Sequence, residues 1–166
     1  TVVLTVSNSL ASHRTSAVVS ITDVPIEGLT ISNDSPTPAG ETVAFSSTVT
    51  SGSNIRYVWD FQDGTPPVEG PSATHIFPIP GTYQINLTAN NTANTIILSD
   101  TVIITDAPII GLSASNDGPT ELGQATTFMA GSTAGTNILY TWDFGDGSPP
   151  QTGVMVQHTY ADLGLY

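Results

Sequence analysis

The sequence has no cysteine and no lysine, and it has no long apolar run. Without cysteine, the chain of 166 residues can form no disulfide and offers no thiol chemistry. No apolar run approaches the roughly 18 residues that a membrane-spanning helix needs, so we predict no membrane insertion. Arg14 and Arg56 are the only basic residues besides histidine, and the formal net charge is −12. Such an acidic surface repels phosphate backbones, which excludes nucleic acid as a partner.

Stretches typical of helices are also missing, whereas Val, Ile and Thr recur along the whole chain. These residues are typical of half-buried strands, and 15 Gly and 12 Pro supply turn signals between them. Apolar and polar residues alternate from Tyr83 to Ala89 and from Ile55 to Phe61, which predicts strands with one buried face. The sequence therefore predicts an all-β sandwich.

A repeat of 83 residues organises the chain. The run from Trp59 to Gly64, Trp-Asp-Phe-Gln-Asp-Gly, recurs from Trp142 to Gly147 as Trp-Asp-Phe-Gly-Asp-Gly, so that position 59 becomes position 142. Residues 1–23 align in the same register with residues 84–106. We therefore predict that 1–23 are the last two strands of one repeat, 24–106 a complete repeat, and 107–166 a repeat without its last two strands.

The two incomplete parts complement each other. Residues 164–166 followed by residues 1–6 reproduce, position by position, the pattern of residues 81–89. We therefore expect residues 1–23 of one copy to complete residues 107–166 of the next. Two arrangements stay open: the chain is one slice of a longer polypeptide that continues end to end, or separate chains donate strands to one another.

The repeated motif resembles the signature of the PKD domain family. The motif residues are Trp59, Asp60, Phe61, Asp63, Gly64, His75, Gly81 and Tyr83 in the first copy, and Trp142, Asp143, Phe144, Asp146, Gly147, His158, Gly164 and Tyr166 in the second. The first copy departs from the family at Gln62, where Gly is usual, and at Phe77, where Tyr is frequent. The resemblance implies an immunoglobulin-like β-sandwich in tandem repeats, a non-catalytic role outside the cell, and a prokaryotic surface protein as the source.

Six aspartates deserve a separate prediction. We expect Asp60, Asp63, Asp143 and Asp146 to accept hydrogen bonds from backbone N–H groups of the turns in which they lie. A calcium site is the alternative, because Ca²⁺ prefers oxygen ligands and the resemblance includes collagenase PKD domains that bind calcium. Asp34 and Asp117 would then contribute to that site. We expect His75 and His158 to pack against aromatic rings and not to bind zinc.

Three Asn-X-Ser/Thr sequons, at Asn33, Asn86 and Asn90, are candidate sites of N-glycosylation. Glycans are also candidate partners.

No Ser-His-Asp set, paired-carboxylate pocket or phosphate-binding loop is recognisable, so we predict that the chain is not an enzyme. The leading hypothesis is a structural repeat of an extracellular filament, sheath, surface layer or adhesin stalk. The alternative is a carbohydrate- or protein-binding accessory region of a secreted hydrolase. That alternative requires a groove of exposed aromatic residues, whereas nearly all aromatic residues here fall on predicted core positions.

Overall fold

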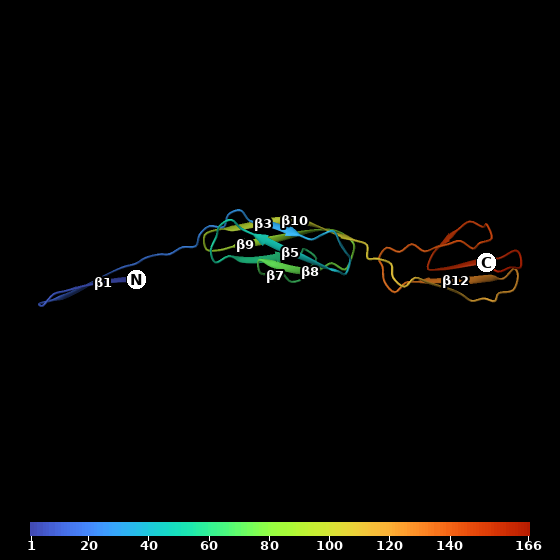
Figure 1. The fold of residues 1–166 in the computed structure, drawn as a ribbon, viewed down its shortest axis with the longest axis horizontal. Helices are drawn as coiled ribbons and strands as arrows, with labels where there is room; N and C mark the ends of the chain where they lie inside the picture. Colours follow the sequence, from blue (N-terminus) through green and yellow to red (C-terminus); the bar gives the residue numbers. More distant parts are fainter. The chain divides into compact units, whose positions relative to one another are not determined.

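The computed structural model describes all residues from 1 to 166, and every regular element in it is a β-strand (Figure 1). The strands are β1 (Val2–Ser7), β2 (Ser12–Ala17), β3 (Thr30–Asn33), β4 (Thr37–Pro38), β5 (Thr42–Thr48), β6 (Arg56–Asp60), β7 (Val68–Glu69), β8 (Ser72–Ile76), β9 (Gly81–Asn90), β10 (Thr95–Thr105), β11 (Ser113–Asn116), β12 (Ala125–Gly131), β13 (Thr141–Trp142), β14 (Gln151–Thr152) and β15 (Met155–Thr159). No helix is therefore present that could span a bilayer.

Strands β1 and β2 form a two-stranded antiparallel hairpin. Its register runs from Val2 opposite Ala17 to Ser7 opposite Ser12. The side chain of Asn8 closes the turn, because its Oδ1 accepts hydrogen bonds from the N–H groups of Leu10 (2.8 Å) and Ala11 (2.9 Å). Every residue of both strands is exposed.

Residues 24–106 contain two sheets. The strand order is β4-β10-β9-β6-β7 in the first sheet and β3-β5-β8 in the second. The short strand β4 runs parallel to β10, with Thr37 opposite Ile104, whereas β6 runs antiparallel to both β7 and β9. This arrangement confirms the predicted all-β, immunoglobulin-like sandwich.

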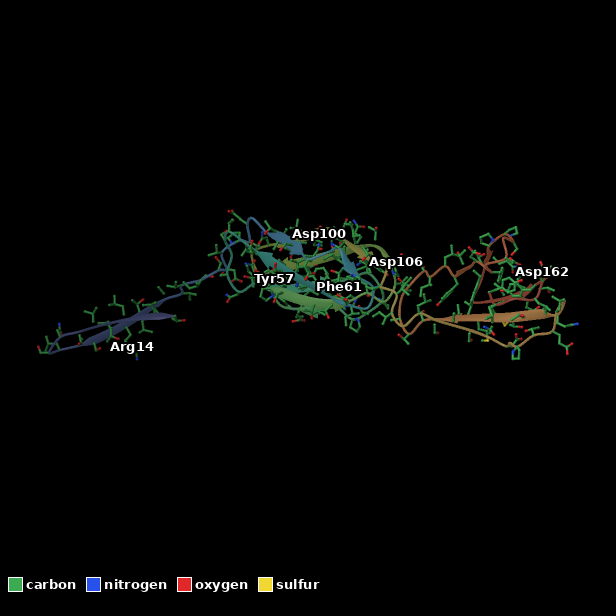
Figure 2. All side chains as sticks on the ribbon, turned by 45° about the vertical axis from the view of Figure 1, so that its right-hand side comes forward. Arg14, Tyr57, Phe61, Asp100, Asp106 and Asp162 are labelled. Atoms are coloured by element: carbon green, nitrogen blue, oxygen red, sulfur yellow. The ribbon has the colours of Figure 1, made fainter.

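An aromatic cluster forms the core of this sandwich. The ring of Phe45, from β5, lies 5.7 Å from that of Trp59, on β6, and 5.1 Å from that of Phe61. Phe45, Trp59 and Phe61 are each 2% exposed or less, and Figure 2 marks Phe61 within this part of the chain. Burial of each such side chain stabilises the fold by about 1.5–3 kcal/mol. Strand β9 sends Ile85 and Leu87 to the buried side, as the alternation predicted.

Residues 107–166 repeat part of this architecture. Strands β11-β12-β15 form a sheet in the order of β3-β5-β8, and β13 pairs with β14 as β6 does with β7. Phe128 lies 5.5 Å from Trp142 and 5.4 Å from Phe144, in the arrangement of the first cluster. Within residues 107–166 no strand corresponds to β9 or β10. Residues 120–121, the equivalents of β4, form no strand because β4 exists only as the partner of β10.

The two equivalent leucines Leu87 and Leu4 test how much the last two strands gain from burial. Leu87 is fully buried in β9, whereas Leu4 is 59% exposed in β1. We expect Leu87→Ala to lower the free energy of unfolding of residues 24–106 by about 2–5 kcal/mol, because the substitution removes buried methyl groups and leaves a cavity. Leu4→Ala, the matched control, should change that free energy by less than about 0.5 kcal/mol. In a Trp142→Phe background, urea unfolding followed by Trp59 fluorescence measures both, and similar losses in the two variants would contradict this assignment of the core.

Candidate functional site

The four aspartates of the repeated motif each close a turn. Asp60 and Asp143 accept hydrogen bonds at 3.0 Å from the N–H groups of Gln62 and Gly145. Asp63 and Asp146 likewise accept at 3.0 Å from the N–H groups two residues further along the chain. The glycines that follow, Gly64 and Gly147, have φ of 86° and 81°, values that L side chains rarely adopt. In all four cases the carboxylate serves the local backbone.

The tryptophan of each motif is fixed by a hydrogen bond that the sequence analysis did not foresee. The indole Nε1 of Trp59 donates to the carbonyl oxygen of Gly70, and that of Trp142 to the carbonyl oxygen of Gly153, both at 2.9 Å. Both glycines have positive φ, of 130° and 148°. A glycine 11 residues after each tryptophan is the signal in the sequence that could have revealed this contact.

The histidine of the second motif lies in a stack of aromatic rings. The imidazole of His158 is parallel to the ring of Phe144, with centroids 4.0 Å apart, and its Nε2 lies 2.7 Å from Oδ2 of Asp146. Tyr160 meets His158 edge-on and stacks on Tyr166 at 4.0 Å. In the first copy, His75 meets Phe77 edge-on at 4.7 Å. Both histidines therefore pack against aromatic rings.

The last tyrosine of each motif bonds back to its own chain. Tyr83, in β9, donates its hydroxyl hydrogen to the carbonyl oxygen of Ile79 at 2.8 Å. Tyr166 donates in the same way to the carbonyl oxygen of Asp162 at 3.1 Å. This is the tyrosine corner found in many immunoglobulin-like sandwiches, and it explains why a tyrosine follows Gly81 and Gly164 two residues later.

The electrostatics of the second motif do not support nucleophilic catalysis. Hydrogen bonds from Ser148 and His158 lower the pKa of Asp146 to about 2. Asp146 accepts from the backbone N–H of Ser148 and lies beside His158, whereas a nucleophilic serine needs its hydroxyl bonded to a histidine. The face of the His158 ring is covered by Phe144. This cluster therefore orders the turn and the strand β15.

The structure does not gather the candidate calcium ligands. Asp34 and Asp117 accept hydrogen bonds at 2.9 Å from the N–H groups of Ala44 and Thr127, and the Thr127 contact lowers the pKa of Asp117. Nowhere do three or more histidine, aspartate or glutamate side chains come together in a way that could hold a metal ion. A calcium site built from Asp34, Asp60, Asp63, Asp117, Asp143 and Asp146 stays a prediction.

The sequon asparagines lie in or beside strands. The Oδ1 of Asn33, at the end of β3, accepts from the N–H of Ser35 at 3.0 Å. The Oδ1 of Asn86, in β9, accepts from the hydroxyl of Ser99 at 2.7 Å. Asn90 ends β9 opposite Arg56. Glycosylation at these three positions stays a prediction.

The segment that leads into each repeat is anchored by an aspartate. Asp23 accepts hydrogen bonds from the side chains of Ser53 (2.8 Å), Asn54 (2.6 Å) and Thr92 (2.6 Å). These bonds, that from Thr92 foremost, lower the pKa of Asp23 to about 2. Asn91 completes the anchor by donating from Nδ2 to the carbonyl oxygens of Val24 (2.8 Å) and Ser53 (2.9 Å).

The equivalent anchor of the next repeat is made only in part. Asp106, labelled in Figure 2, accepts hydrogen bonds from Thr136 (2.8 Å) and Asn137 (2.6 Å), the counterparts of Ser53 and Asn54. The counterparts of Asn91 and Thr92 would follow the strand equivalent to β9, which residues 107–166 do not contain.

An open apolar surface is the most prominent feature of residues 107–166. Ile109 and Leu112 are 57% and 70% exposed, whereas their counterparts Ile26 and Leu29 are 1% and 9% exposed. They line a cavity of about 670 Å³ together with Trp142. A smaller cavity of about 210 Å³ lies beside Thr120, Leu122 and Tyr160. We call these two cavities and their lining the open side.

The backbone at Gln62 provides a test of the motif. Gln62 has φ of 56°, and the equivalent Gly145 has φ of 75°. A residue with a side chain is strained in this left-handed region by about 1–2 kcal/mol. Glycine avoids this strain, but its greater conformational freedom in the unfolded state offsets part of the gain in stability. We expect Gln62→Gly to raise the free energy of unfolding of residues 24–106 by about 0.5–1 kcal/mol. Gln62→Ala should give no gain in the same urea titration, and equal gains in both variants would show that backbone strain is not the cause.

The anchor at Asp23 predicts a dependence on pH. Because its pKa is about 2 when folded and near 3.8 when unfolded, its stabilising contribution is present above pH 4 and is lost as the pH falls through 2. In a Trp142→Phe background, Asp23→Asn should lower the urea midpoint reported by Trp59 at pH 7 and change it little at pH 2. Asp106→Asn, the same substitution in the next repeat, is the control and should leave the Trp59 midpoint unchanged at both pH values. A loss for Asp23→Asn that is as large at pH 2 as at pH 7 would contradict the assignment.

Several known proteins are similar to this chain. The chain matches human polycystin-1 with 33% identity over 111 residues, 64% of the chain, and human polycystin-1-like protein 1 with 28% identity over 114 residues, 66% of the chain. It spans only 2% and 4% of the length of these two relatives. Among solved structures, the PKD domain of the human VPS10 domain-containing receptor SorCS2 matches 54% of the chain, and the chain covers 82% of it, with 22% identity and a TM-score of 0.47. The three N-terminal domains of the highly immunogenic outer capsid protein of bacteriophage RB49 match 80% of the chain, 49% of that structure, with 15% identity and a TM-score of 0.33.

The family assignment rests on the match to the PKD domain family itself. That match covers residues 28–103 and 110–166, and so reaches both motif copies and both sandwich parts. The chain therefore belongs to the PKD domain family, as a tandem array of immunoglobulin-like modules.

Proposed function

We propose that this chain is a structural repeat of an extracellular array, such as a filament, sheath, surface layer or adhesin stalk. The observation that carries the proposal is the linker between repeats. The carbonyl oxygen of Thr105, at the end of β10, accepts a hydrogen bond from the N–H of Ala39 at 3.0 Å. The very next residue, Asp106, is bonded to Thr136 and Asn137. No unbonded residue lies between one repeat and the next, so the linker favours a stiff connection.

The register of the repeats supports the same proposal. Many structural details recur at the offset of 83 residues, including the bridge between Glu27 and Ser51 and its counterpart between Ile110 and Ala134. A surface array needs such uniform units, because equal units and equal linkers produce a regular assembly.

The distribution of aromatic residues argues against the alternative of a binding accessory region. Tyr166, at 54% exposure, is the only exposed aromatic side chain, and the other aromatic residues are buried or half-buried. A groove that stacks sugar rings needs several exposed aromatic faces. The proposal includes an extracellular location and a non-catalytic role for the chain, since PKD domains are non-catalytic modules typical of extracellular regions. A prokaryotic source stays a prediction, since the curated relatives named above are human.

A polypeptide of several copies, each joined from Tyr166 to the Thr1 that follows, tests this function. We expect its maximum dimension, measured by small-angle X-ray scattering, to grow linearly with the number of repeats. Replacing Asp106 and its equivalents with alanine should remove the hydrogen bonds of each linker, two at Asp106 and four at Asp23, and shorten the mean dimension through added flexibility. Glu41→Ala, which removes an equal charge at an exposed site, should leave the dimension unchanged. A dimension that grows only with the square root of repeat number would indicate a flexible string and overturn the proposal.

A further inference from the structure

We propose that the hydroxyl of Thr127 reacts with the side-chain amide of Gln157 to form an ester between strands β12 and β15, with Asp117 as the base. The Oγ1–H bond of Thr127 and the Cδ–Nε2 bond of Gln157 break, a bond forms between Oγ1 and Cδ, and ammonia leaves. The reaction occurs once in each chain, so it is a modification of the chain and not enzymatic turnover. It does not depend on the proposed array.

The two reacting groups lie directly opposite each other on neighbouring strands. Thr127, in β12, pairs with Gln157, in β15, in an antiparallel register. The Nε2 of Gln157 donates to the Oγ1 of Thr127 at 3.3 Å, so the amide carbon is one covalent bond away from an atom that already contacts the hydroxyl. Directly opposed residues of a sheet have Cβ atoms about 4.5–5.5 Å apart, a distance that these two side chains can span together. The ester therefore requires rotation of side chains and no movement of the backbone.

The third group, Asp117, is bonded to the same threonine. Its Oδ1 accepts a hydrogen bond from the backbone N–H of Thr127 at 2.9 Å. The hydroxyl of Thr127 also donates to this carboxylate, and the two bonds, that of the backbone foremost, lower the pKa of Asp117. The carboxylate is therefore ionised at neutral pH, as a base must be. The hydroxyl proton passes to Asp117 as Oγ1 attacks, and then leaves with the nitrogen as ammonia.

These groups lie on the face of the sheet that points away from the open side. Phe128 and Ala130 of β12 line the two cavities of the open side, and alternation along the strand sends Thr127 and Met129 to the opposite face. On that face Asp117, Thr127 and Met129 line a separate cavity of about 230 Å³. The reacting groups therefore belong to the outer surface of the sheet and not to the core.

A pair of methionines flanks the reacting groups. Met129 and Met155 lie directly opposite each other, two residues along β12 and β15 from the threonine and the glutamine. Their counterparts in the complete repeat are Ser46 and Ser72. Apolar thioether side chains in this position shield an ester from water on one side, which slows its hydrolysis.

Two effects supply the rate of a reaction that is very slow between a free alcohol and a free amide. Well-oriented groups within one molecule react as if each were present at about 10⁵–10⁸ M. A base positioned on the attacking hydroxyl contributes a further factor of about 10²–10⁴. One substitution can remove each effect separately.

The complete repeat lacks the reacting pair and serves as an internal reference. Asp34, at the position of the base, accepts a hydrogen bond from the backbone N–H of Ala44 at 2.9 Å. Ala44 stands at the position of the reacting threonine, and Thr74 stands at that of the glutamine. The carboxylate is therefore present without the hydroxyl or the amide, so residues 24–106 cannot form this ester.

Mass spectrometry of the purified chain detects the ester. After incubation at neutral pH, the intact mass should fall by that of one ammonia molecule. Digestion before aspartate residues should leave peptides 117–142 and 146–161 joined, and hydroxylamine, which cleaves esters but not amides, should separate them. A parent chain that keeps its full mass and gives no joined peptides would overturn the proposal.

Two substitutions separate the roles of the groups. Thr127→Val removes the hydroxyl while it keeps the shape of the side chain, and should abolish the joined peptides. Asp117→Ser keeps a hydrogen-bond acceptor but no carboxylate, and should slow their formation about 10²–10⁴-fold. Joined peptides that form equally fast in the parent chain and in Thr127→Val would overturn the proposal.

Transfer of the reacting pair into the complete repeat is the stricter test. Ala44→Thr/Thr74→Gln, beside Asp34, should create a second ester, which doubles the loss of ammonia and joins peptides 34–59 and 63–99. Ala44→Val/Thr74→Gln, the matched control without a hydroxyl, should lose ammonia only once. A folded Ala44→Thr/Thr74→Gln chain that forms no second ester would show that the three groups do not suffice, and would overturn the roles assigned to them.

Discussion

The burial of the aromatic cluster beneath the last two strands is the interaction on which each repeat depends. Trp59, on β6, and Phe61, directly after β6, contact Phe45 of the second sheet. Strand β9 pairs with β6, so that Leu87 lies opposite Trp59. Where both strands are present, these side chains are excluded from water. Where the strands are absent, in residues 107–166, Phe144 stays buried and Trp142 is half-buried, but Ile109 and Leu112, which pack beside the cluster in the complete repeat as Ile26 and Leu29, are exposed. One hairpin thus decides whether the repeat has a closed core.

The same hairpin also carries the link between repeats. Its turn supplies Asn91 and Thr92, which bind the segment at Asp23 and Val24 that enters the repeat. The strand β10 ends at Thr105, directly before the next anchoring aspartate. Core closure and linker anchoring are therefore one event, because both require the hairpin to be in place.

The repeated Trp-Asp-Phe motif serves architecture and not chemistry. Its aspartates are engaged with backbone N–H groups, its histidine is covered by an aromatic ring, and its tryptophan is fixed to a glycine carbonyl. A group held in this way is poorly placed to bind a substrate, since its polar atoms already have partners.

The sequence by itself determined the all-β class, the 83-residue repeat and the inward side of the strands, because alternation along a strand and identity between copies are local properties of the chain. It also indicated the turns at Gly64 and Gly147, where a glycine follows an aspartate. Only the tertiary structure decided which carbonyl holds each tryptophan, how Tyr83 bonds back to Ile79, and that Asp23 collects Ser53, Asn54 and Thr92. Those partners come from segments up to 69 residues apart, and their proximity follows from the packing of strands, which no local pattern of residues specifies.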